Sequence, residues 1–141
     1  NLLEFYKLRE EMIFDKNWTL VNYLVEGPLL CGKTENMAYV NGALTFTDEK
    51  FEELDTYIFL NSESKCVTLR KKDSKKSISV EFPEFDNILI WKKPYSEFFC
   101  IEPWCGLPDY VGGPGEISQK PGINKLEKNG VFQRTHTIII D

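Results

Sequence analysis

The sequence predicts an all-β protein, an antiparallel β-sandwich, on three observations. Short segments that alternate apolar and polar residues recur along the chain, as in 67–70 and 77–82, and this alternation is typical of strands with one buried face. Turn-forming residues such as Asn41-Gly42 separate these segments. Helical periodicity is limited to one short stretch, 47–54. Together these features favour two packed antiparallel sheets.

In the N-terminal half, residues 18–25 have a strand composition and end at the turn signal Gly27-Pro28. The Asn41-Gly42 pair lies between the segments 37–40 and 43–46 and predicts a tight type I′ hairpin. The short helix follows next. Thr47 is a suitable N-cap, and the two acids after it suit the first turn of a helix.

In the C-terminal half, 67–70 and 77–82 are expected to form a hairpin whose solvated turn is the basic run between them. Residues 87–91 are almost continuously apolar, as in a strand covered on both faces. A further apolar strand, 97–102, ends in a carboxylate, and the alternating segment 132–140 is the predicted last strand.

The stretch 103–121, rich in glycine and proline, is predicted to be a long loop, and loops of this length are more often functional than idle.

Length and charge restrict the function further. The 141 residues suit a single domain spanning 1–141, and the net charge of −5 disfavours binding to nucleic acid. No apolar run approaches the ~20 residues of a membrane span. Asn1 leads directly into an apolar segment, so we interpret the chain as part of a longer protein. We therefore expect neither a nucleic-acid nor a membrane partner.

The four cysteines, at positions 31, 66, 100 and 105, are irregularly spaced. Their spacing fits neither a disulfide framework nor a zinc site, which needs four suitable ligands. We expect free thiols, no bound metal and a cytoplasmic location.

Glu102 is the strongest candidate for catalysis. It ends an apolar strand whose residues 98–101 are expected to be buried, and Trp104 would shield one side of it from water. Burial makes a carboxylate a stronger proton acceptor, as a general base requires. The alternative is an ordinary ion pair with a lysine or arginine at the strand end.

The segment 99–109, with Glu102-Pro103-Trp104 at its centre, resembles the C-terminal motif of the aldose 1-epimerase (galactose mutarotase)-like family, in its bacterial Glu-Pro-Trp branch. Weaker similarities to the family occur at 51–59, 87–91, 119–123 and 130–132. The resemblance implies a galactose mutarotase-like supersandwich, of which this chain is the C-terminal half.

The resemblance also implies the activity: an isomerase of carbohydrate metabolism that interconverts the α and β anomers of a hexose without a cofactor or metal. A base removes the proton of the anomeric hydroxyl while an acid protonates the ring oxygen. Glu102 corresponds to the base, and Asp55 to a residue that hydrogen-bonds sugar hydroxyls. Trp91 would stack on the sugar, or else be a core aromatic, and Trp104 would wall the pocket.

The family's general acid is a histidine in a Gly-His-Pro-like stretch of the N-terminal half. This sequence has no such stretch, and its one histidine, His136, corresponds to no catalytic position. We therefore expect the chain to supply the base but not the acid, and to be inactive or weak alone. The alternatives are a non-catalytic carbohydrate-binding module and a sandwich that mediates interactions without a sugar site. A fragment would also be expected to associate through exposed sheet edges.

Overall fold

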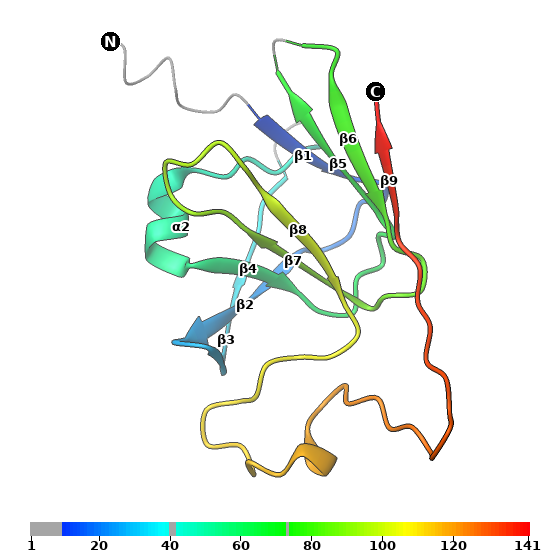
Figure 1. The fold of residues 1–141 in the computed structure, drawn as a ribbon. Coiled ribbons are helices and arrows are strands. Elements are labelled where there is room, and N and C mark those ends of the chain that lie inside the picture. Colours follow the sequence, from blue (N-terminus) through cyan, green and yellow to red (C-terminus); the bar gives the residue numbers. More distant parts are fainter. Residues whose placement is uncertain (1–9, 40–41, 73) are drawn as a thin grey trace.

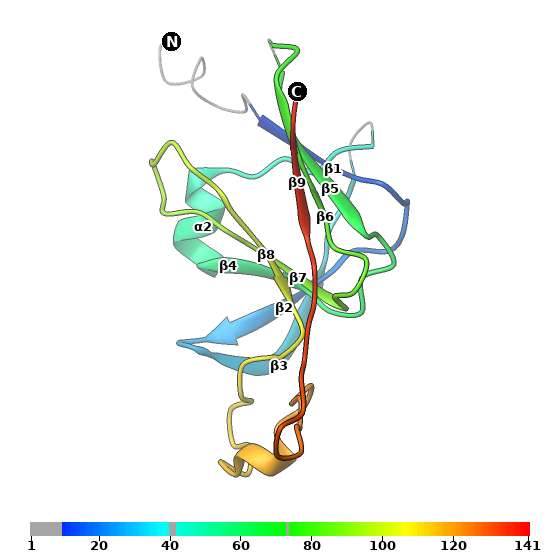
Figure 2. The same ribbon diagram turned by 45° about the vertical axis from the view of Figure 1, so that its right-hand side comes forward.

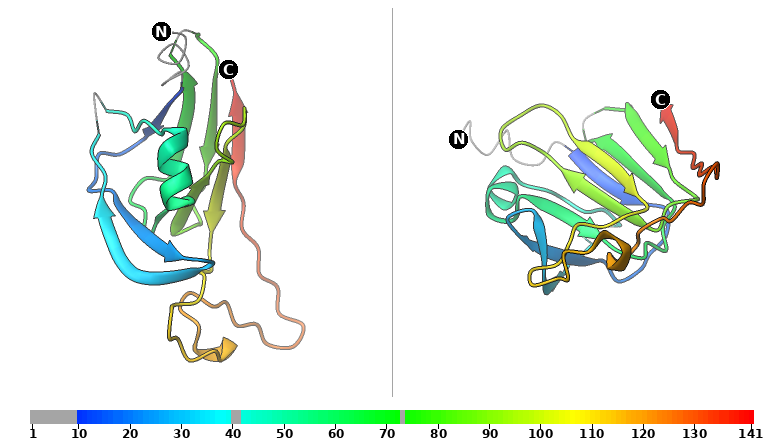
Figure 3. Two further views of the ribbon diagram at one scale, coloured as in Figure 1. Left: turned by 90° about the vertical axis from the view of Figure 1, so that its left-hand side faces the viewer. Right: turned by 60° about the horizontal axis from the view of Figure 1, so that its bottom comes forward.

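Two antiparallel sheets pack face to face, which confirms the predicted β-sandwich (Figures 1 and 3). The computed structural model describes residues 10–39, 42–72 and 74–141. One sheet has the strand order β1-β5-β6-β9 and the other β3-β2-β4-β7-β8. The elements are, in chain order, β1 (Glu10–Phe14), β2 (Val21–Glu26), β3 (Leu29–Asn36), α2 (Asp48–Leu54), β4 (Thr56–Phe59), β5 (Cys66–Lys71), β6 (Ser77–Glu81), β7 (Asn87–Trp91), β8 (Cys100–Trp104), the 3₁₀ helix η1 (Ile117–Gln119) and β9 (Thr137–Ile140).

The inner core lies between the two sheets. Alternate residues of the five-stranded sheet, Tyr57 and Phe59 on β4 with Ile88 and Ile90 on β7, are buried in it. Phe59 meets Phe14 of the opposite sheet edge-on, with ring centroids 5.8 Å apart. Burying each side chain of this size contributes about 1.5–3 kcal/mol. Four of the five residues of β7 are buried, so the predicted strand with two covered faces is confirmed.

The predicted short helix is confirmed as α2. Its N-cap is Thr47, whose hydroxyl oxygen accepts a hydrogen bond from the backbone N–H of Lys50 at 3.2 Å. Phe51 anchors the helix in the inner core. The helix lies beside the connection between β7 and β8 (Figure 1), where the backbone N–H of Tyr95 donates to Asp48 at 2.9 Å.

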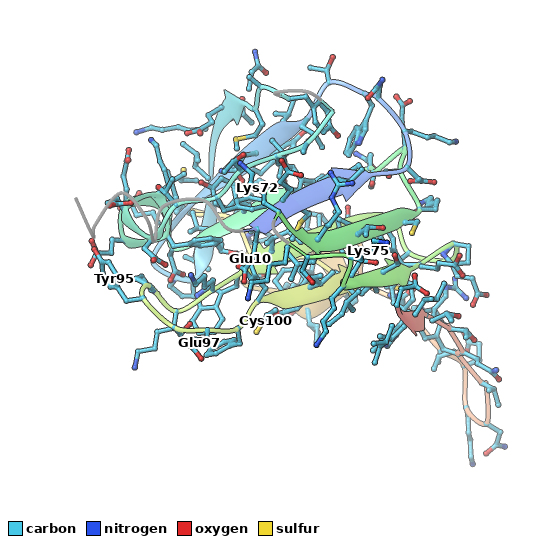
Figure 4. The ribbon with its side chains drawn as sticks, turned by 90° about the horizontal axis from the view of Figure 1, so that it is seen from above. Glu10, Lys72, Lys75, Tyr95, Glu97 and Cys100 are labelled. Carbon is cyan, nitrogen blue, oxygen red and sulfur yellow. The ribbon has the colours of Figure 1, made fainter. Side chains whose placement is uncertain are left out.

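The predicted hairpin around the basic run is confirmed, because β5 pairs with β6 in antiparallel register. Seen from above (Figure 4), Lys72 lies near Glu10 of β1. In the same view Lys75 and Tyr95 lie on opposite sides of Glu10. Asp73, also in this turn, lies outside the described residues. The basic turn is at the end of the sandwich opposite the long loop before β9 (Figure 1).

The hairpin predicted around Asn41-Gly42 stays a prediction. Val40 and Asn41 lie outside the described residues. Leu44, from the predicted second strand of that hairpin, pairs with Met12 of β1 through hydrogen bonds of 2.8 and 3.0 Å. Both side chains are buried in the inner core, and this burial favours the long-range pairing.

Two predicted strands have different bounds. β8 begins at Cys100 rather than residue 97, because its partner β7 ends at Trp91, which pairs with Cys100. Glu102 therefore lies inside a strand that continues to Trp104. β9 begins at Thr137 rather than residue 132, because its neighbour β6 ends at the residue that pairs with Thr137, Glu81.

Residues 105–136 form an arm that leaves one end of the sandwich, carries η1 at its tip and returns to β9 (Figures 1 and 2). Apolar side chains on the arm are exposed, including Ile117 at 70% and Val131 at 85%. Ile138 and Ile140 of β9 are exposed as well. Association through this edge stays a prediction. Neither helix of the described residues is long and apolar enough to cross a membrane.

Asp15 joins the end of β1 to the start of β5. Its carboxylate accepts hydrogen bonds from the Ser64 hydroxyl and from the backbone N–H groups of Lys65 at 3.0 Å and Cys66 at 3.1 Å. Burial opposes ionisation of Asp15, but these hydrogen bonds outweigh it and the pKa of Asp15 is lowered.

Asp15→Asn should therefore make stability less dependent on pH in acid. A lowered pKa means that the ionised carboxylate stabilises the fold above the unfolded-state value of about 3.9. This stabilisation is lost as the pH falls through the folded-state value. Urea unfolding between about pH 5 and 2.5 should show a steeper fall for wild type than for Asp15→Asn. Asp86→Asn, at an exposed side chain, is the control. Equal slopes for wild type and Asp15→Asn would contradict this account.

Candidate functional site

The predicted site residues lie on the outer face of the five-stranded sheet, the face that points away from the other sheet. Ile58 of β4 and Leu89 of β7 point to this face and are buried, at 1% and 6% exposure. They belong to the outer cluster, which consists of buried Leu30, Ile58, Leu60 and Leu89 with partly buried Tyr23, Val25, Trp91, Trp104, Leu107 and Tyr110. The site therefore stands on an apolar floor.

The segment after β8 returns to β3 and covers part of this cluster. The backbone N–H of Leu30 donates to Asp109 O at 2.9 Å, and the N–H of Val111 donates to Leu30 O at 2.9 Å. Leu30 and Tyr110 thus form a parallel bridge. The side chain of Asp109 forms an ion pair with Lys120 at 3.6 Å, which supports a structural role for it.

The register of β7 and β8 puts Glu102 and Trp91 on the same face. Leu89 pairs with Glu102, and Trp91 pairs with Cys100. Paired residues point to one face, and alternate residues of a strand share a face. Cys100, Glu102 and Trp104 of β8 therefore lie on the outer face with Leu89 and Trp91. Glu102 is diagonal to Trp91 and two residues from Trp104 on its own strand.

Each of the two candidate carboxylates accepts a hydrogen bond from an indole. Trp104 Nε1 donates to Glu102 Oε2 at 3.2 Å, and Trp91 Nε1 donates to Asp55 Oδ1 at 3.4 Å. Among the described residues, no lysine or arginine forms an ion pair with Glu102, so the strand-end ion pair is not found there. The four predicted residues thus form two tryptophan–carboxylate pairs.

Asp55 has a strained backbone. It is the C-cap of α2, with φ 65° and ψ −54°, close to a γ-turn of positive φ, which is rare for residues other than glycine. The backbone N–H of Asp55 donates to Phe51 O at 2.9 Å. The hydroxyl of the following residue, Thr56, donates to Ile90 O at 3.2 Å. The conformation costs about 1–3 kcal/mol, and such strain tends to occur at functional sites.

The cysteine thiols and the histidine are further reactive side chains of the described residues. Burial and the nearby charge of Glu102 raise the pKa of the Cys100 thiol, so it stays protonated at neutral pH. All four cysteines are free. His136 precedes β9 of the other sheet, where its ring lies 6.2 Å from that of Phe85. In the part of the chain that the structure describes, no three His, Cys, Asp or Glu side chains could hold a metal ion.

A cleft of about 460 Å³ lies next to the end of β8. Trp104, Leu107, Lys120 and Ile123 are among its lining residues, whereas Glu102 is not. Gly122 lies between the lining residues Pro121 and Ile123 and has φ 72°, and a Cβ there would lie 3.2 Å from Cys105 O. Only glycine fits this approach without a shift of the backbone. Trp104 therefore borders both the cleft and the outer cluster.

Two features of the site were not predicted. The hydrogen bond between Trp91 and Asp55 has no signature in the sequence pattern, because the two residues are 36 positions apart. Tyr23 and Tyr110 also join the outer cluster. The alternation of Tyr23 and Val25 along β2 was an available signal, but Tyr110 lies in a loop without periodicity.

No protein-family model matches the chain. Over 79 residues, 55% of this chain, the sequence is 30% identical to the plasmid and chromosomal LacX proteins of Lactococcus lactis subsp. lactis, and this stretch is 26% of each relative.

Two solved structures are similar. One is a galactose mutarotase-like protein from Lactobacillus casei, with a TM-score of 0.74 and 22% identity, matched over 94% of this chain and 45% of that one. The other is a galactose mutarotase related enzyme from Lactobacillus acidophilus, with a TM-score of 0.72 and 19% identity, matched over 95% and 44%. The chain thus has the fold of galactose mutarotase-like proteins and spans less than half the length of these two.

Leu89→Ala should lower the free energy of unfolding by about 2–5 kcal/mol, because it removes a buried side chain of the outer cluster, beside Glu102. Val131→Ala is the control, since Val131 is 85% exposed and its loss should change stability by less than about 0.5 kcal/mol. Urea denaturation measures both. A loss for Leu89→Ala as small as that of the control would mean that the outer cluster is not packed.

Proposed function

We propose that this chain is part of an aldose 1-epimerase-like isomerase that acts on a hexose in carbohydrate metabolism. The supporting observation is that Glu102 and Asp55 each lie beside an indole on the outer face of a mutarotase-like sandwich. Carboxylates accept hydrogen bonds from sugar hydroxyls, and an indole offers an apolar face to a pyranose. The free thiols support the proposed cytoplasmic location.

In the proposed reaction Glu102 is the general base. It takes the proton of the anomeric hydroxyl, and the electron pair of that O–H bond forms the C1 carbonyl. The C1–O5 bond breaks, and O5 takes a proton from a general acid. Rotation about the C1–C2 bond and re-addition of O5 to the other face give the other anomer. Both protons are returned on closure, so the isomerisation needs no cofactor.

The other proposed site residues bind the sugar. Asp55 accepts hydrogen bonds from sugar hydroxyls, Trp91 stacks on the apolar face of the pyranose, and Trp104 forms a wall. The general acid is expected from a part of the protein upstream of this chain. A second candidate function is a non-catalytic carbohydrate-binding module. It is favoured by the position of His136, which contacts Phe85 beside the other sheet.

Glu102→Gln should remove most of the mutarotation in a protein that carries the upstream half. Glutamine keeps the shape but cannot take the proton, so the rate should fall about 10²–10⁴-fold, while sugar affinity changes little. Polarimetry of freshly dissolved α-D-glucose or α-D-galactose, corrected for the spontaneous rate, measures catalysis, and calorimetry measures binding. Glu127→Gln, at an exposed position of the arm, is the control. A Glu102→Gln variant as fast as wild type would show that Glu102 is not the base.

The 141-residue chain alone should bind the sugar but catalyse about 10²–10⁴-fold more slowly than the longer protein, because it lacks the positioned acid. The same polarimetry compares the two. Equal rates would mean that the acid lies within these 141 residues. Binding without mutarotation in both proteins would identify the carbohydrate-binding module, and no binding in either would favour the interaction domain.

A further inference from the structure

The two tryptophans of the outer face already use their indole N–H groups to bind carboxylates. Trp104 Nε1 donates to Glu102 Oε2 at 3.2 Å in a half-buried setting. Trp91 Nε1 donates to Asp55 Oδ1 at 3.4 Å, on the exposed rim. Most N–H···O hydrogen bonds in proteins are 2.7–3.2 Å long. The pair formed by Trp104 and Glu102 is therefore the shorter and better shielded of the two.

Packing fixes the indole of Trp104. Its ring belongs to the outer cluster together with Leu89 and Leu107, and its main-chain oxygen accepts a hydrogen bond from Asn87 Nδ2 at 3.2 Å. Asn87 is itself held, because its Oδ1 accepts from the backbone N–H of Asn61 at 3.2 Å. A side chain locked by its neighbours can hold a mobile group in a defined place. The packed indole of Trp104 therefore restricts the orientation of the Glu102 carboxylate, and not the reverse.

The hydrogen bond also makes the two carboxylate oxygens of Glu102 different. Oε2 is bound to the indole, whereas no donor in the described part of the chain binds Oε1. A general base must have an oxygen that is free to accept and is held within reach of the proton. A carboxylate that could rotate freely would spend much of its time in unproductive orientations.

We propose that Trp104 is a positioning residue: its indole N–H holds Oε2 of Glu102 so that Oε1 faces the sugar. The role rests on the proposed function, because it requires Glu102 to be the general base. Trp104 acts through Glu102 and does not touch the reacting atoms. Trp91 and Asp55 form the corresponding, longer pair and serve as the internal comparison.

The first test reads the hydrogen bond in the 141-residue chain from the ¹H–¹⁵N signals of its three indoles, Trp18, Trp91 and Trp104. Glu102→Gln removes the acceptor charge and should move the Trp104 signal. The Trp18 signal should stay, because its nitrogen bonds no carboxylate of the described chain. Asp55→Asn, the matched control, should move the Trp91 signal and leave that of Trp104. A Trp104 signal unaffected by Glu102→Gln would overturn the proposal. Because this test leaves Trp104 in place, its result does not depend on whether a Trp104 variant folds.

The second test is kinetic and uses the protein with its upstream half. Trp104→Phe keeps an aromatic ring but removes the N–H, so kcat should fall about 10–100-fold with KM unchanged. Trp18→Phe is the control and should leave both constants unchanged. A rise in KM with kcat intact would mean that the indole N–H serves sugar binding and not the orientation of Glu102, and it would overturn the positioning role. If wild type shows no mutarotation, the proposed function fails, and the indole signals still decide whether Trp104 holds Glu102.

Discussion

The burial of β7 on both faces is the constraint on which the rest of this structure depends. Ile88 and Ile90 point into the inner core, and Leu89 points into the outer cluster. Hydrogen bonds to β4 on one edge and β8 on the other satisfy the backbone, as burial demands. The side chain of Asn87 is satisfied in the same way, by Asn61 and by Trp104. The strand that carries Glu102 is therefore coupled to the centre of the fold.

Under the proposed function, this coupling means that the packing of the fold and the proposed chemistry depend on the same part of the sheet. The side chains that form the floor of the outer face are those that fill the outer cluster, so the orientation of an indole there depends on packing beneath it. The hydrogen bond of Trp104 with Glu102 is half-buried beside the outer cluster, where a lower local dielectric strengthens it, whereas that of Trp91 with Asp55 is exposed. Polar side chains on an exposed loop would lack such packing beneath them.

The sequence predicted the elements whose signals are local. The hairpin of β5 and β6 follows from alternation, β7 from its continuous apolar run, and α2 from Thr47 at its N-cap. The bounds of β8 and β9 were wrong, because the partner strand decides where pairing starts. The common face of Glu102 and Trp104 could be predicted from their two-residue spacing along a strand. The contact of Asp55 with Trp91 could not, because it requires the pairing of β4 with β7.

The positive φ of Asp55 has a consequence for laboratory evolution of this protein. Glycine reaches such dihedrals without a steric penalty, so a glycine at position 55 would relieve strain of about 1 kcal/mol or more. A library selected for thermal stability alone would therefore enrich glycine there and discard the carboxylate that Trp91 contacts. Stabilising this domain by selection without losing the contact with Trp91 requires that position 55 be held constant, since the backbone at this corner is relieved of strain by a residue without a carboxylate.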